Sequence, residues 1–149
     1  MSKFLPLIMV LVAGLIQPYQ VAMNTKLNKV AGSPPVAGFV TFAGGAVVCA
    51  VLWLLGVMHR GQPSALSGAP WWAWLTGPVG VIIIFSALIA LPISGAALVV
   101  TVMVFGQAAG SMVLDHYGWM DVKRVPINVW RVLGLMLILG GTLLMAKHD

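Results

Sequence analysis

The chain has 149 residues, which is enough for about one domain. Hydrophobic residues make up 60% of it and charged residues only 7%, whereas a typical soluble domain is roughly 45–50% apolar and about 25% charged. A water-soluble fold this short could not bury so much apolar surface, because small domains hide only part of what they contain. The composition predicts a membrane protein and excludes a soluble enzyme, a secreted domain and a disordered chain.

The formal net charge of +5 comes from eight Lys/Arg against three Asp. The cations stand singly between apolar segments, without the basic patch of a nucleic-acid-binding surface, and are typical of flanks that face anionic lipid headgroups. The lone Cys49 leaves no partner for an intrachain disulfide, and we expect it to pack inside an apolar run. No pair of histidines has metal-ligand spacing. We expect no metal, no cofactor and no nucleic-acid partner.

A membrane crossing needs about 20 mainly apolar residues, and the charges divide the chain at that interval. The first charge-free run, Phe4 to Thr25, predicts one helix. It resembles a signal peptide, but no small-x-small site follows it and we expect no cleavage. Pro34 and Pro35 favour the start of a second helix.

The run of 54 residues from Gly61 to Leu114 carries no formal charge and is too long for one crossing. It predicts two helices joined by a tight turn at Pro92, Ser94 and Gly95. The sequence therefore predicts an all-α membrane protein with one transmembrane domain, residues 1–149. Its five helices are expected at about 4–25, 35–57, 71–91, 95–114 and 127–145.

Tryptophans mark the predicted helix boundaries, as an aromatic belt at the lipid interface would. They are Trp71, Trp72, Trp74, Trp119 and Trp130. Trp53, near the end of the second helix, is a candidate aromatic wall for a substrate, with interfacial packing as the alternative.

An odd number of crossings places the two termini on opposite sides of the membrane. The positive-inside rule then sets orientation by the excess of Lys and Arg on one side. The N-terminal side carries Lys3, Arg60, Lys123, Arg124 and, if its side chain reaches the headgroups, Arg131; the other side carries Lys26, Lys29 and Lys147. So small a difference favours insertion in both orientations and an antiparallel homodimer, with one weakly fixed orientation as the alternative.

Polar residues inside a crossing are pointers to function because they are costly in lipid. Gln17, Gln20 and Asn24 lie within about 60° of one another on the first helix. Pro18 lies among them and frees the carbonyl of Gly14. This stripe is a candidate substrate-binding surface, and hydrogen bonding that only holds the helices together is the alternative.

The predicted fourth helix carries Gln107, Ser111 and Asp115 at spacings of four, followed by His116. Gln107 and Ser111 are further candidate substrate contacts. Asp115 and His116 are candidates for proton or ion coupling, since a carboxylate or an imidazole here can titrate. The alternative is an interfacial Asp115 paired with Lys123 or Arg124, while His59 and His148 are expected to be solvated.

Gly106 and Gly110 form a G-x-x-x-G motif, which allows close helix contacts within one chain or between two. The chain contains no HExxH, Walker A or GxSxG motif. ATP-driven pumping by this chain alone is therefore excluded, and catalysis is not expected.

Three motifs stand out together: Gln17-Pro18, Gly106-Gln107 and the spacing from Asp115 to Gly118. They belong to longer stretches, Gly14 to Leu27, Trp71 to Gly80, Leu91 to Ala96, Phe105 to Gly118 and Arg131 to Gly134. These stretches resemble one family of bacterial membrane proteins, the YdcZ-type "putative inner membrane exporters" of the drug/metabolite transporter superfamily. The resemblance implies five crossings, an inner-membrane location and antiparallel dimers, either of one chain or with a sister subunit.

Two departures from related patterns are visible. Thr76-Gly77 stands where the family pattern has Gly-Gly, and the first helix lacks the glutamate of the small multidrug resistance transporters. Their exchange mechanism therefore does not carry over. We expect a secondary transporter of a small polar or amphipathic solute, with alternating access at a cavity between two copies. A passive dual-topology channel and a non-transporting membrane subunit are the alternatives.

Overall fold

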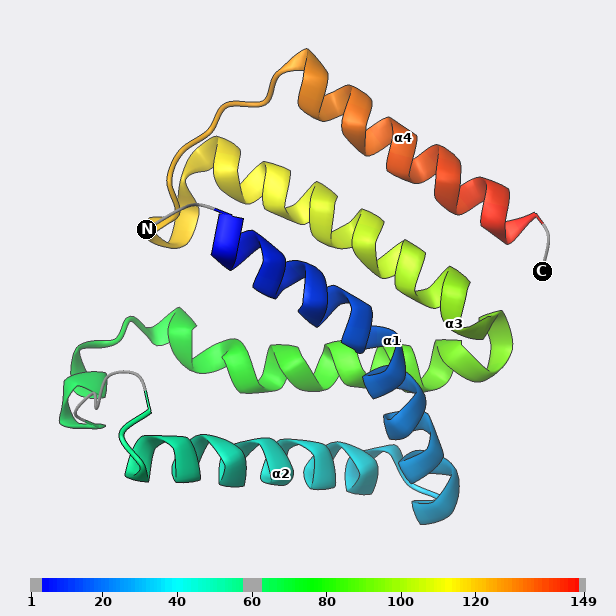
Figure 1. The fold of residues 1–149 in the computed structure, drawn as a ribbon. Coiled ribbons are helices and arrows are strands. Elements are labelled where there is room, and N and C mark those ends of the chain that lie inside the picture. Colours follow the sequence, from blue (N-terminus) through cyan, green and yellow to red (C-terminus); the bar gives the residue numbers. More distant parts are fainter. Residues whose placement is uncertain (1–3, 58–62, 148–149) are drawn as a thin grey trace. The chain divides into compact units, whose positions relative to one another are not determined.

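The computed structural model describes residues 4–57 and 63–147. The predicted flanks and charges at Lys3, His59, Arg60 and His148 lie outside this range. Four long helices make up most of the described chain (Figure 1). They are α1 (Phe4–Ala31), α2 (Pro34–Leu54), α3 (Thr76–Tyr117) and α4 (Val129–Ala146). Short 3-10 turns lie between them: η1 (Pro63–Gly68), η2 (Trp71–Leu75) and η3 (Trp119–Asp121).

Four apolar segments of the described chain are long enough to cross a membrane. Only 6–11% of the residues in their most apolar windows are buried. A helix that is apolar on every side and still exposes that surface is suited to lipid. The all-α membrane prediction is confirmed in this form, while the structure counts four such segments where the sequence predicted five.

The difference in count arises at α3, which runs for 42 residues through both predicted crossings. Its helical conformation continues past Pro92 and is interrupted at Gly95, whose φ of 69° and ψ of 163° are non-helical. That backbone region is essentially accessible to glycine alone. The predicted turn is therefore a break within α3, and the first predicted boundary moves because residues 71–75 form η2.

Two helix ends differ from the predicted boundaries. The first helix was expected to end near residue 25, but α1 continues through Lys26 and Lys29 to Ala31, because backbone hydrogen bonding does not stop where hydrophobicity does. The second helix ends at Leu54 rather than residue 57. Gly56, at a φ of 71°, closes it: the N–H of Gly56 donates to the Trp53 carbonyl and that of Val57 to the Leu52 carbonyl. This is a Schellman end, which favours glycine.

The chain divides into two compact units, one up to Pro92 and one from Ile93 onwards. In the first, the end of α1 packs on the start of α2. Val21, Asn24 and Thr25 are at most 8% exposed, and Ala37 is 1% exposed. Thr41 Oγ1 donates a hydrogen bond of 2.9 Å to Asn24 Oδ1, joining the two helices.

Two reciprocal contacts join α2 to the first part of α3. A Cβ atom added to Gly80 would lie 3.1 Å from the Phe42 ring, and one added to Gly38 would lie 3.2 Å from the Phe85 ring. Each helix thus places a phenylalanine over a glycine of the other. Because the earlier position on α2 meets the later one on α3, the two segments run antiparallel.

In the second unit, α3 beyond Gly95 and α4 form an antiparallel hairpin. Thr101 Oγ1 lies 3.2 Å from the sulfur of Met145 at one end. Arg131 and Asp115 form an ion pair of 3.0 Å at the other end. These two contacts fix the register along the hairpin and position the site described next. The predicted single transmembrane domain stays a prediction.

Candidate functional site

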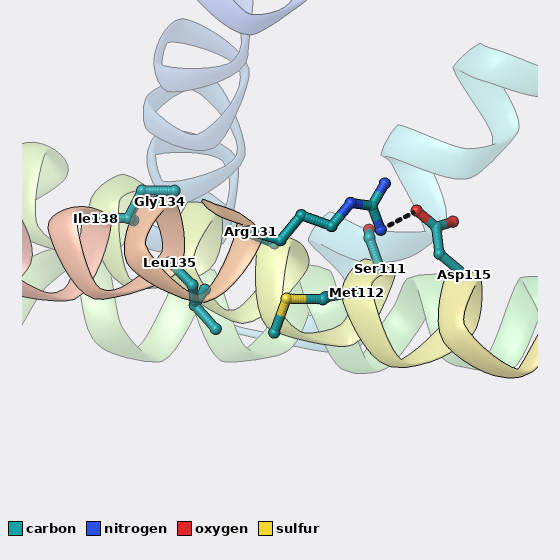
Figure 2. Close-up of a pocket in the computed structure, with 8 residues that line it drawn as sticks. Ser111, Met112, Asp115, Arg131, Gly134, Leu135 and Ile138 are labelled. Atoms are coloured by element: carbon teal, nitrogen blue, oxygen red, sulfur yellow. Dashed lines mark hydrogen bonds and ion pairs between the residues drawn. The ribbon is translucent and has the colours of Figure 1, made fainter. Parts of the chain in front are cut away.

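A pocket of about 260 Å³ lies between the end of α3 and the start of α4. Most of its lining is apolar, and its polar groups are a hydroxyl, a carboxylate and a guanidinium (Figure 2). The lining residues are Ala108, Ser111, Met112, Asp115, Arg131, Gly134, Leu135 and Ile138. Both Ser111 and Asp115 were predicted site residues, and the structure places them in one pocket.

The ion pair between Arg131 and Asp115 is the polar centre of this pocket. Arg131 Nη1 donates to Asp115 Oδ2 at 3.0 Å and to the Val125 carbonyl at 3.4 Å. The two side chains are 33% and 25% exposed. Within residues 4–57 and 63–147 this is the one ion pair found. A charged side chain on an apolar helix is costly unless it pairs with an opposite charge. The presence of Asp115 and Arg131 on α3 and α4 therefore marks this pocket as a candidate functional site.

The local sequence explains why Arg131 reaches this place. Asn128 caps α4: its side-chain oxygen accepts a hydrogen bond of 2.9 Å from the Arg131 backbone N–H. Asn is a preferred residue at such a cap. The cap fixes Arg131 in the first turn of α4, directly across from the last turns of α3.

The loop after α3 is bound back onto the helix end by three hydrogen bonds. The Val125 N–H donates to the Asp115 carbonyl at 2.8 Å, and Arg124 Nε donates to the His116 carbonyl at 3.1 Å. The Ile127 N–H donates to His116 Nδ1 at 3.2 Å. The predicted pairing of Asp115 with Lys123 or Arg124 is therefore wrong: Arg124 bonds to a carbonyl, and Arg131 is the partner of the carboxylate.

The bond to His116 has a structural consequence. Nδ1 is the hydrogen-bond acceptor of this ring, so the imidazole joins the loop to the end of α3. Tyr117 packs edge-on against this ring, with centroids 4.9 Å apart. His116 thus supports the loop. Its predicted part in coupling remains a proposal.

The predicted polar stripe of α1 divides into two environments. Asn24 is 8% exposed and bonded to Thr41, so it joins two helices. Gln17 is half-buried and Gln20 is exposed. Neither glutamine side chain has a hydrogen-bonding partner among residues 4–57 and 63–147. Pro18 lies inside α1 as expected, without ending the helix.

The remaining predicted residues lie on exposed surfaces. Gln107 is exposed one turn before Ser111, outside the pocket lining, and has no hydrogen-bonding partner in the part of the chain that the structure describes. Trp53 is 47% exposed near the end of α2. Apart from their own stretch of helix, no described atom lies within 4 Å of a Cβ position at Gly106 or Gly110. Their predicted role in close helix packing therefore finds no partner within the second unit.

The sequence did not reveal Arg131 as the ion-pair partner of Asp115, and its side chain was expected to reach the lipid headgroups instead. The available signal was their opposite charge: Asp115 lies at the end of one apolar segment, and Arg131 lies near the start of the next. In lipid such charges pair with each other. The choice of partner could not be read from spacing, because Lys123 and Arg124 lie closer in sequence.

No group of three or more His, Cys, Asp or Glu side chains that could hold a metal ion occurs in residues 4–57 and 63–147. A family model described as "Putative inner membrane exporter, YdcZ" matches residues 5–144. The chain belongs to this family. No curated protein and no solved structure matches it.

Membership of the YdcZ family, together with the four apolar helices, makes the chain a multi-pass inner-membrane protein. The resemblance inferred from Gln17-Pro18 and Gly106-Gln107 is thereby confirmed at the level of the family. The family supports a role as a transporter or exporter.

Proposed function

We propose that this YdcZ family protein is a secondary exporter of a small polar or amphipathic solute, bound by glutamine side chains in a cavity between two copies. The observation that carries the proposal is that Gln17, Gln20 and Gln107 have no hydrogen-bonding partner in the described chain. An amide facing hydrocarbon without a partner costs several kcal/mol, so such groups are not expected to face lipid. A polar cavity satisfies them.

The proposal includes five crossings, with α3 crossing twice. A continuous helix of 42 residues would be roughly 60 Å long, about twice the hydrocarbon thickness of a bilayer. Its non-helical residue Gly95 lies near the middle, where a hairpin that passes the membrane twice would need to turn. The length of α3 and the position of Gly95 support the predicted count of five.

Five crossings leave one chain with its termini on opposite sides, and a second copy inserted upside down supplies an inverted repeat. Inverted repeats around a central site are a common basis of alternating access. The unpaired glycine positions Gly106 and Gly110 support such a contact, because they allow another helix to approach closely. We propose an antiparallel dimer of this chain, or a pair with a sister chain.

Substrate contacts are proposed for Gln17, Gln20, Gln107 and Ser111, with Trp53 as an aromatic wall. Asn24 acts within the same stripe through its free amide group, since Thr41 occupies only its oxygen. Coupling to a proton or cation is assigned to Asp115, whose Oδ1 atom is not engaged by Arg131, with His116 beside it. The chain needs no nucleotide site for this mechanism.

The test is solute flux into liposomes that contain the purified protein. Gln17→Ala is expected to abolish saturable, trans-stimulated flux while the dimer stays folded. The matched control is Ser67→Ala, a small polar residue outside the long helices. Wild-type flux in Gln17→Ala would remove that residue from the site. Ohmic current would favour a channel, and no flux under any gradient would favour a non-transporting subunit.

A further inference from the structure

We propose that the pocket between α3 and α4 binds the carboxylate of a small amphipathic acid, and that the guanidinium of Arg131 holds this carboxylate. The residues that line this pocket come from α3 and α4. Binding of the acid can be tested without transport. The inference rests on the proposed function only in treating this acid as a transported substrate.

The first argument is the set of donors that Arg131 leaves unused. A guanidinium has five N–H donors in a rigid, planar fork. Nη1 provides both hydrogen bonds that Arg131 makes from its side chain, one to Asp115 and one to the Val125 carbonyl. The donors on Nε and Nη2 have no partner in the described chain. Such a fork matches the two oxygens of a carboxylate.

The second argument is the surface beside the guanidinium. Met112, Leu135 and Ile138 line the same pocket as Arg131, and Ser111 adds a hydroxyl (Figure 2). A ligand whose carboxylate binds Arg131 could therefore place its apolar part against these side chains. This combination selects an amphipathic acid over an inorganic anion, which has no apolar part.

The volume of the pocket indicates the size of a probe that fits inside it. An engineered apolar cavity of about 150 Å³ is known to hold benzene. At the same packing, the pocket of about 260 Å³ accommodates about ten non-hydrogen atoms. Benzoate, with a ring and a carboxylate, is a suitable probe of this size.

The charges favour an acid over a cation. Asp115 is the one acidic side chain in the lining, and Arg131 already neutralises it. The loop that closes this end contributes Lys123 and Arg124 against Asp121. A bound organic cation would lie beside the positive charge of Arg131 and would have to share Asp115 with it. A bound carboxylate shares Arg131 with Asp115, so Asp115 acts as an internal competitor.

Competition between Asp115 and a bound carboxylate for Arg131 can be tested directly. In detergent solution, benzoate is expected to raise the melting temperature of the wild-type protein, whereas benzamide and benzylamine do not. Asp115→Asn keeps the shape of the side chain and removes the competing charge, so benzoate is expected to bind several-fold more tightly. Arg131→Met is expected to weaken binding at least ten-fold. The matched control, Lys147→Met, removes one positive charge at the far end of α4 and is expected to leave the affinity unchanged.

Arg131→Met could fail to fold, so Leu135→Trp provides a second variant. It fills the apolar side of the pocket and keeps the ion pair, and it is expected to block benzoate. Binding that survives this variant, or that Asp115→Asn weakens, would overturn the proposal. Preference for benzylamine over benzoate would overturn it as well.

A lipid headgroup phosphate is also an anion that Arg131 could bind, so it is tested in a separate binding measurement. Dioctanoyl phosphatidylglycerol is tested beside benzoate, with dioctanoyl phosphatidylcholine as the control. A shift with phosphatidylglycerol and none with benzoate would make the pocket a lipid site and refute the acid. Benzoate binding that persists in Gln17→Ala, when that variant has lost flux, supports this inference independently of transport. Binding by a wild-type protein without flux would count against the proposed function alone.

Discussion

Arg131 of α4 donates to Asp115 of α3 at 3.0 Å, across the closed end of the helical hairpin. The two residues are 16 positions apart and belong to segments that the sequence separates by a loop. The loop is itself bonded to the carbonyl of Asp115. One residue thus anchors both the following loop and the next helix.

This ion pair predicts a measurable coupling energy. In a double-mutant cycle of Asp115→Asn and Arg131→Met, the free energies of unfolding are expected to be non-additive by about 1 kcal/mol, because both side chains are partly exposed and screening limits the gain. Unfolding of the purified protein measures it. The same cycle with Lys123→Met is expected to give no coupling to Asp115. Coupling to Lys123 instead of Arg131 would show that the loop pairing is the real one.

The contact of Phe42 with Gly80 predicts a size limit at that glycine. Gly80→Leu is expected to destabilise the protein by about 1–3 kcal/mol, since the ring lies 3.1 Å from the first added carbon. Gly77→Leu is the control one turn earlier, where nothing lies within 4 Å of the added carbon. Thermal unfolding compares the two. Equal melting temperatures would contradict the described packing.

The bond from Thr41 to Asn24 predicts a structural role that is separable from transport. Thr41→Val removes the hydroxyl that bonds to Asn24 Oδ1 and to the Ala37 carbonyl. The expected loss is about 0.6 kcal/mol, the average for such bonds in membrane proteins. Unfolding measures the loss, and liposome flux is expected to stay at the wild-type level once protein amounts are matched. A complete loss of flux would place this contact in the transport cavity.

The break at Gly95 predicts where the middle of α3 lies relative to the membrane. In a Cys49→Ala background, Ser94→Cys is expected to react with a membrane-impermeant maleimide. In the proposed antiparallel pair, each side of the membrane exposes Ser94→Cys of one copy, just as it exposes Ser67→Cys of the other copy. If α3 crosses the membrane twice, the turn around Gly95 lies at the membrane surface and is exposed to water. Labelling in sealed and in opened vesicles measures the exposure of each cysteine. Protection of Ser94→Cys from both sides would instead place it inside the bilayer and leave four crossings.

The sequence by itself determined the class of the protein. The scarcity of charge, the lengths of the apolar runs and motifs such as Gln17-Pro18 were sufficient for an all-α inner-membrane protein of the YdcZ family. The reason is that lipid constrains composition over whole segments, and such constraints need no tertiary contact to be recognised. The start of α2 at Pro34 followed from local chemistry as well.

Only the tertiary structure decided which polar groups meet. Hydropathy does not distinguish Asn24, bonded to Thr41, from Gln17, which has no partner in the described chain. Sequence distance alone favoured Lys123 and Arg124 as partners of Asp115, because they lie nearer to it along the chain than Arg131 does. The register of the hairpin, set by side-chain contacts along two helices, brings Arg131 to Asp115 instead.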